Sequence, residues 1–139
     1  MSIRSIPLIF LAFLFYNVVI LFAGSMPAGE MLRQVVFSIP SIRGDSLGFT
    51  WGDIILLVTL FLLFIEIVKA TFTSSASLVD HGLSMLVFIA CLVEFLLIDR
   101  AFTSVFFIVM VATLIDVVAG YTIGIRVARR DIGFTTGQE

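Results

Sequence analysis

The sequence has little of the residues that build soluble or covalently cross-linked proteins. Charged residues make up 13% of its 139 residues, against about 25% in soluble domains. Its single cysteine, Cys91, excludes an intrachain disulfide and a cysteine-rich metal site. Eight basic residues against ten acidic ones leave no positive excess to hold a nucleic-acid backbone, so we expect no nucleic-acid partner.

Residues that commonly carry catalysis are also scarce. His81 is the single histidine, so the chain offers no histidine pair for a metal or a haem and no cysteine–histidine cluster. No glycine-rich phosphate-binding loop occurs. The sequence therefore predicts no metal site, no cofactor and no enzymatic activity.

The sequence is rich in apolar residues. They make up 60% of the chain, and their abundance excludes a disordered protein. A helix needs about 20 mostly apolar residues to cross a hydrocarbon core about 30 Å thick. We therefore predict an all-α integral membrane protein, a single membrane domain over 1–139. Its four expected transmembrane helices cover residues 6–23, 52–70, 78–98 and 101–126.

The first apolar run allows a second interpretation. A short basic start, an apolar run and the small residues Ala23-Gly24-Ser25 are typical of a signal peptide with its cleavage site. Because the chain retains this segment from Met1 onward, we interpret it as a signal anchor.

The distribution of lysine and arginine predicts the orientation, since cytoplasmic loops are enriched in both. With the N-terminus in the cytoplasm, five basic residues lie inside: Arg4, Lys69, Arg126, Arg129 and Arg130. Three lie outside: Arg33, Arg43 and Arg100. The sequence thus favours cytoplasmic N- and C-termini, with residues 127–139 as a cytoplasmic tail.

The outer loop at 24–51 is the longest segment between spans. Apolar residues within 29–39 fall on one helical face, which predicts a short amphipathic helix on the outer leaflet or against a partner. Thr50 and Asp53 precede the second apolar run with the spacing of a helix cap. Trp51 would then lie at the outer interface.

Asp116 is the clearest polar residue within an expected span. A carboxylate at a helix centre costs about 2.5–3.5 kcal/mol on insertion scales. Asp116 shares a helix face with the small residues Ala112, Gly120 and Gly124, which let a neighbouring helix approach closely. It is either a hydrogen-bonded packing residue or a carboxylate that carries protons or ions.

Other polar residues within the spans allow the same two interpretations. Glu66 precedes Lys69 by three positions and can pair with it, or it can share a carboxylate site with Asp116 at similar depth. His81 and Asp80 are a candidate proton-entry pair, since imidazole titrates near neutral pH.

The third span carries a polar stripe of Asp80, Ser84, Cys91 and Glu94 at helical spacing, which predicts a face turned away from lipid. Glu94 lies near the outer end, where it can extend toward Asp99 and Arg100 or accept a hydrogen bond from Asn17.

Three stretches carry a resemblance that extends over roughly the last two-thirds of the chain: Leu78–Glu94, Thr113–Gly120 and Arg129-Arg130-Asp131. With them the sequence resembles small inner-membrane proteins of alphaproteobacteria. The resemblance implies a four-helix protein in a bacterial inner membrane. It implies no activity, catalytic residue or cofactor.

Two functions remain open at this point. The first is a non-catalytic accessory or scaffold subunit that binds other membrane subunits or itself through polar and small-residue faces. The second is a small homo-oligomeric transporter or proton or ion pathway lined by intramembrane carboxylates. A pore former fits less well, because the chain retains structural carboxylates and a long outer loop. A membrane enzyme fits less well, because the sequence contains no catalytic constellation.

Overall fold

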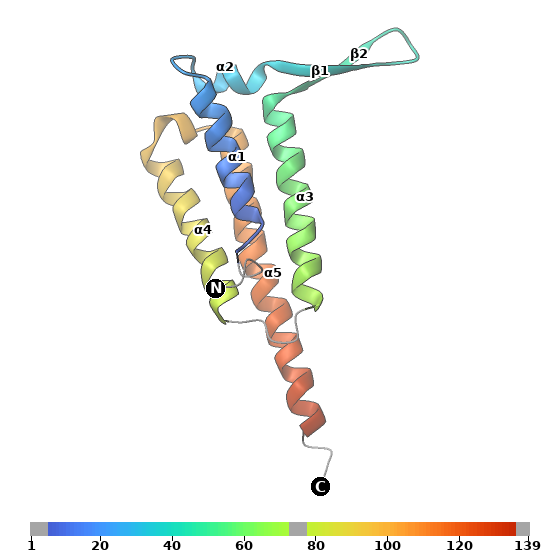
Figure 1. The fold of residues 1–139 in the computed structure, drawn as a ribbon, viewed down its shortest axis with the longest axis vertical. Coiled ribbons are helices and arrows are strands. Elements are labelled where there is room, and N and C mark those ends of the chain that lie inside the picture. The colour runs from blue at the N-terminus through green and yellow to red at the C-terminus, as the bar shows by residue number, and fades with distance from the viewer. Residues whose placement is uncertain (1–5, 73–77, 136–139) are drawn as a thin grey trace.

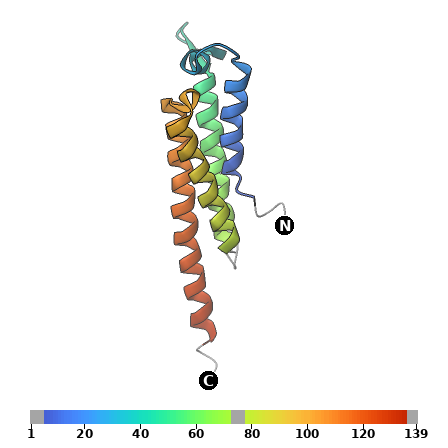
Figure 2. The same cartoon turned by 90° about the vertical axis from the view of Figure 1, so that its left-hand side faces the viewer.

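The computed structural model describes residues 6–72 and 78–135. Four helices lie side by side as a bundle, and a short helix and a β-hairpin lie across one end of it (Figures 1 and 2). The elements in chain order are α1 Ile9–Phe22, α2 Ala28–Arg33, β1 Val35–Pro40, β2 Ser46–Thr50, α3 Trp51–Phe72, α4 Leu78–Leu97, the 3-10 turn η2 Asp99–Ala101 and α5 Ser104–Thr135. We call the end at which α1 ends and α3 begins the hairpin end, and the other the tail end.

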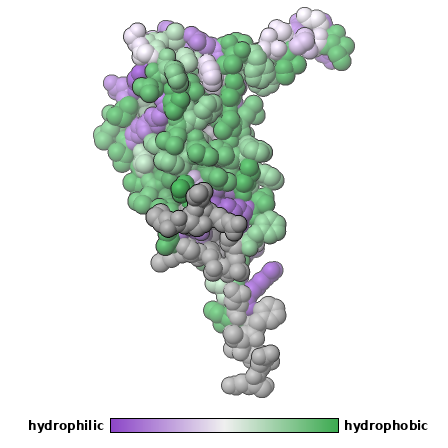
Figure 3. Space-filling view, in the orientation of Figure 1, coloured by the Kyte–Doolittle hydropathy of each residue, from purple (hydrophilic) through white to green (hydrophobic). Residues whose placement is uncertain are grey.

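Three helices are long and apolar enough to cross a membrane: Trp51–Phe72, Val79–Leu97 and Ser104–Arg130. Hydrophobic residues cover most of the visible helical surface (Figure 3), as expected of a surface that meets lipid. The predicted membrane character is therefore supported, and the expected spans at 52–70, 78–98 and 101–126 correspond to these helices.

α1 is shorter than the predicted span at 6–23. Its 14 residues cover about 21 Å at 1.5 Å per residue, less than the hydrocarbon core of about 30 Å. It starts after Pro7, whose ring has no N–H to contribute. It ends before Gly24, whose φ of 58° belongs to the left-handed region that terminates helices.

The outer loop contradicts two predictions. The expected helix at 29–39 is wrong, because α2 ends at Arg33 and Val35–Pro40 is a strand paired with Ser46–Thr50. The fold is therefore not purely α-helical. β-branched and aromatic residues such as Val35, Val36 and Phe37 favour a strand, and the stacked rings of Phe37 and Phe49, 4.9 Å apart, add a cross-strand contact.

The end of the chain also differs from the expected tail at 127–139. The last helix starts at Ser104 rather than at 101, since Asp99–Ala101 forms a separate 3-10 turn. It then continues to Thr135, and residues 136–139 lie outside the described part. At 32 residues it is about 48 Å long, so its last turns extend beyond the other helices (Figure 2).

α5 is the central helix of the bundle and packs against α1, α3 and α4. Phe106, Val109 and Thr113 on α5 are fully buried. They meet buried residues of the neighbouring helices, such as Tyr16, whose ring lies 4.8 Å from that of Phe106. The core is therefore a seam along α5.

Candidate functional site

The polar residues that the sequence singles out gather in two groups, one at each end of the bundle. At the tail end, Asp116 of α5 is 4% exposed, and its carboxyl group lies beside the Ser84 side chain of α4. Glu66 and Lys69 of α3 lie close enough to interact electrostatically with Asp116. The expectation that Glu66 and Asp116 share one depth agrees with this arrangement.

Glu66 binds two partners with its two oxygens. Lys69 Nζ lies 2.9 Å from Oε1, which is the ion pair expected from their spacing. The backbone N–H of Leu8 donates to Oε2 at 2.9 Å. The first N–H groups of a helix have no partner within the helix, so Glu66 satisfies one of these groups at the start of α1.

His81 lies against α5 at the position where α5 has no side chain. A Cβ atom on Gly120 would lie 2.9 Å from His81 Nδ1, so only glycine lets the ring approach this closely. The ring also stacks on Tyr121, with centroids 4.9 Å apart. Gly120 is therefore a small packing residue, as predicted, and its partner is His81, which the sequence did not identify.

Three buried polar atoms at the tail end have no hydrogen-bond partner within the described ranges: Asp80 Oδ1, His81 Nε2 and Asp116 Oδ2. Asp80 and His81 are both half-buried at the start of α4. Their interpretation as a proton-entry pair stays a prediction.

The stripe on α4 turns inward, as its polarity predicts. Cys91 is fully buried, and its thiol lies beside the Thr113 side chain of α5, whose hydroxyl donates to the Met110 carbonyl at 2.6 Å. Ala112 is buried in the same seam, whereas Gly124 is only half-buried further along α5. The α4–α5 contact therefore combines small residues with buried polar side chains.

At the hairpin end, Asn17 of α1 donates to Glu94 of α4 at 3.3 Å, as the sequence suggests. Arg100 does not extend to Glu94 in the described structure. Its guanidinium donates to the backbone carbonyls of Ile20 at 2.9 Å and Met26 at 3.3 Å. Arg100 therefore binds the C-terminus of α1, where unpaired carbonyls and the helix dipole favour a cation.

Tyr16 and Thr103 are polar residues that sequence reasoning missed. The Tyr16 hydroxyl donates to the Arg100 carbonyl at 2.9 Å and shares a 2.7 Å hydrogen bond with Thr103 Oγ1. Thr103 also accepts from the N–H of Phe106 at the start of α5. The signal in the sequence was a threonine just before a long apolar run, which is the usual position of a helix cap.

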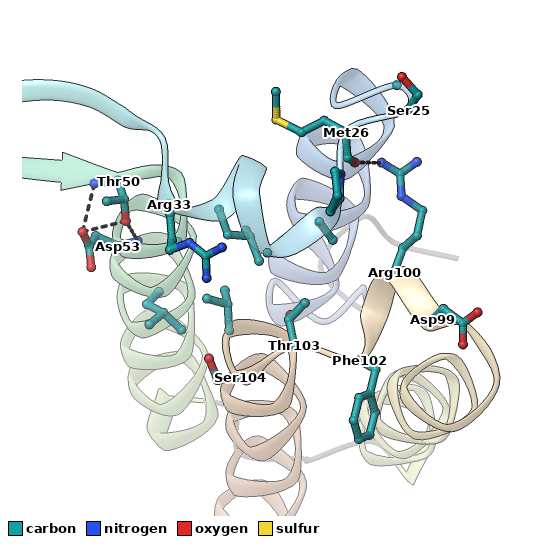
Figure 4. Close-up of a pocket in the computed structure, with 18 residues that line it drawn as sticks. Ser25, Met26, Arg33, Thr50, Asp53, Asp99, Arg100, Phe102, Thr103 and Ser104 are labelled. Atoms are coloured by element: carbon teal, nitrogen blue, oxygen red, sulfur yellow. Dashed lines mark hydrogen bonds between the residues drawn. The ribbon is translucent and has the colours of Figure 1, made fainter.

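A cavity of about 880 Å³ opens at the hairpin end, between α2 and the first turns of α3 and α5. Figure 4 shows the Arg33 side chain between the starts of α3 and α5.

The start of α3 is capped by Thr50 and Asp53. The Thr50 N–H and hydroxyl donate to Asp53 at 2.9 and 2.8 Å, and Thr50 Oγ1 accepts from the Asp53 N–H. The predicted cap of α3 is thereby confirmed.

Within the described residues, no group of three or more histidine, cysteine, aspartate or glutamate side chains is arranged to hold a metal ion. Comparison with known proteins gives no match to a family model, to a curated protein or to a solved structure. The arrangement of the polar residues at the tail end and at the hairpin end is therefore the basis for a functional proposal.

Proposed function

We propose that the chain is a four-span protein of a bacterial inner membrane, with α1 as the fourth span. Both ends of α1 are bonded by side chains from elsewhere in the bundle, Glu66 at its start and Arg100 at its end. Backbone groups in lipid must be satisfied within the protein, so this arrangement suits a helix surrounded by hydrocarbon. Local thinning of the bilayer accommodates its short length.

The proposed orientation places the tail end in the cytoplasm. Lys69, Arg126, Arg129 and Arg130 lie at or beyond the tail end, whereas Arg33, Arg43 and Arg100 lie at the hairpin end. Arg4, the remaining basic residue, is outside the described ranges. The bias of basic residues supports cytoplasmic termini.

We further propose that the protein is a non-catalytic accessory or scaffold subunit of a larger membrane complex. One observation carries this proposal: polar side chains of the expected spans join one helix of the chain to another. Glu66 joins α3 to α1, and Asn17 joins α1 to α4. Such bonds fix helix positions, which is what a rigid subunit requires.

The C-terminal part of α5 supplies the contact to a partner in this proposal. Arg126, Arg129 and Arg130 are exposed there, and they border a groove of about 410 Å³ that also includes Thr71 of α3. Arginine pairs well with carboxylates at protein interfaces. We therefore expect an acidic cytoplasmic surface on the partner.

The test is native extraction in a mild detergent, followed by measurement of the complex mass and identification of co-purifying subunits. Arg129→Ala with Arg130→Ala should lower the recovered partner at least fivefold. Arg129→Lys with Arg130→Lys preserves the cytoplasmic charge that sets orientation, and Arg43→Ala is the matched control at the hairpin. A particle containing only this chain contradicts the scaffold role.

One observation favours a second function, a proton or ion pathway. Asp116 Oδ2 is buried without a partner in the described structure, close to Glu66 and Lys69. If this carboxylate carries protons, Asp116→Asn should abolish flux in vesicles that contain the chain alone, while assembly persists. Unchanged flux in both Asp116→Asn and Glu66→Gln rejects the pathway.

A further inference from the structure

The β-hairpin projects sideways from the bundle at the level where α3 begins (Figure 1). Directly paired residues of antiparallel strands lie on the same face, and successive residues alternate between faces. One face of the hairpin carries the large apolar residues Phe37, Ile39, Leu47 and Phe49. The other carries the small residues Ser38, Pro40, Ser46 and Gly48, with Val35 beside Gly48 at its base. The hairpin is therefore amphipathic.

The large residues of the apolar face are poorly covered by the chain itself. Phe37 is 48%, Ile39 51% and Leu47 61% exposed. An isolated two-stranded hairpin is at best marginally stable in water, and a packed hydrophobic face is what normally stabilises it. The exposed face of this hairpin thus requires an apolar environment.

The apolar face continues onto the outer surface of α3. Leu47 and Phe49 line a concavity of about 300 Å³ together with Gly48 and with four residues of α3, which are Asp53 at its upper edge in the first turn and then Leu56, Leu57 and Leu60. Leu57 and Leu60 are 53% and 58% exposed. Because α3 is long and apolar enough to cross a membrane, this flank of the helix faces hydrocarbon, and the hairpin's apolar face borders the same region.

The ends of the hairpin are suited to a membrane interface. Trp51 follows β2 directly and starts α3, and indole rings favour the boundary between headgroups and acyl chains. Arg43 and Asp45 lie exposed in the turn at the tip, where headgroups and water can solvate them, and the neighbouring Ile42 is also fully exposed. The apolar face thus lies between polar groups at the tip and the interface residue at the base.

We propose that this hairpin is an arm that lies on the bilayer surface, with Phe37, Ile39, Leu47 and Phe49 inserted among the outermost acyl-chain carbons. Its small-residue face is turned to the headgroups and water. The occupant of the apolar face is lipid, because that face is continuous with the flank of a membrane-crossing helix. The inference rests on α3 spanning the membrane and is independent of the scaffold role.

Neighbouring residues on opposite faces provide the test. Leu47→Cys and Ser46→Cys are each labelled with an environment-sensitive fluorophore in the full chain, with Cys91→Ala leaving a single thiol. The labelled proteins are reconstituted into vesicles of phosphatidylcholine and phosphatidylglycerol, with iodide on both sides. The probe at 47 should be blue-shifted and quenched by a nitroxide near the top of the acyl chain. It should be several-fold less accessible to iodide than the probe at 46.

Two results overturn the proposal. Equal iodide access at 46 and 47 places the arm in water. Protection of both probes that grows with the protein-to-lipid ratio means that a second copy covers the hairpin. Leu57→Cys on the exposed flank of α3 reports whether the bundle is inserted, and a second pair, Ile39→Cys and Ser38→Cys, repeats the comparison on β1 in case either first variant does not fold.

Discussion

The Tyr16 side chain links three parts of the chain: α1, the turn before α5, and α5 itself. It contacts the Arg100 carbonyl and the Thr103 hydroxyl, while the Tyr16 ring packs on Phe106. The residue is 1% exposed, so water cannot readily replace a lost contact. A single hydroxyl therefore holds α1 against the turn that connects α4 to α5.

Tyr16→Phe should preserve the ring contacts and remove only these hydrogen bonds. Leaving buried polar groups without partners costs about 1–3 kcal/mol, so the variant should be destabilised by about that amount. The measurement is reversible unfolding in mixed micelles. Tyr121→Phe is the control, because Tyr121 is 38% exposed and should change stability little. Equal effects for both variants would contradict the role of Tyr16.

Residue pairs close in sequence were easier to predict than those joined by the fold. The spacing of Glu66 and Lys69 on one helix indicates their ion pair directly. The bond between Asn17 and Glu94 is an exception among the distant pairs, because their similar depth in two spans already suggested it. Arg100 was different, since its partners are backbone carbonyls of α1, and a sequence does not show which helix end a side chain will meet.

At the scale of elements, the C-terminus of α1 depends on Arg100. Arg100→Ala should leave the carbonyls of Ile20 and Met26 without this donor. We expect local opening there to become easier by on the order of 1.4 kcal/mol, or about tenfold faster amide exchange over the last turn of α1. Hydrogen exchange with mass spectrometry measures this. Arg43→Ala should leave exchange in α1 unchanged, and protection equal to wild type in Arg100→Ala would refute the cap.

The loop after α1 shows why a hydrophobic pattern can be misassigned. Leu32, Val35, Val36 and Ile39 fit one face of a helix, but alternation from Phe37 to Ile39 fits a strand equally well, and short apolar runs are ambiguous between the two. Pairing with Ser46–Thr50 decides the outcome. That pairing needs the turn at residues 41–45 and the strand beyond it, which helical periodicity does not take into account. The cap formed by Thr50 and Asp53 was predictable because it is local.

For the whole molecule, the proposed orientation can be tested by labelling. Arg43→Cys lies in the hairpin turn and Thr71→Cys at the tail end, and both positions are exposed. A membrane-impermeant maleimide added to intact spheroplasts should modify Arg43→Cys and should reach Thr71→Cys only after lysis. The native Cys91 is fully buried and serves as the unlabelled background. The reverse pattern would show that the orientation is inverted.

The bundle as a whole was predictable in part. Long apolar runs indicated the membrane helices, because the thickness of the hydrocarbon core sets their length. Periodicity also placed Asp116 on a face with Ala112 and Gly120. It did not show that Ser84 and His81 of α4 cover that face, since the choice of neighbour depends on how all the helices pack together.

The two bonds at the ends of α1 also have a consequence for biosynthesis. Leu8 is bound by a residue 58 positions later in the chain, and Ile20 by one 80 positions later. α1 is therefore synthesised well before either partner, and Arg100 is added only after all of α4. A chain truncated before Arg100 would leave the carbonyls of Ile20 and Met26 without this donor.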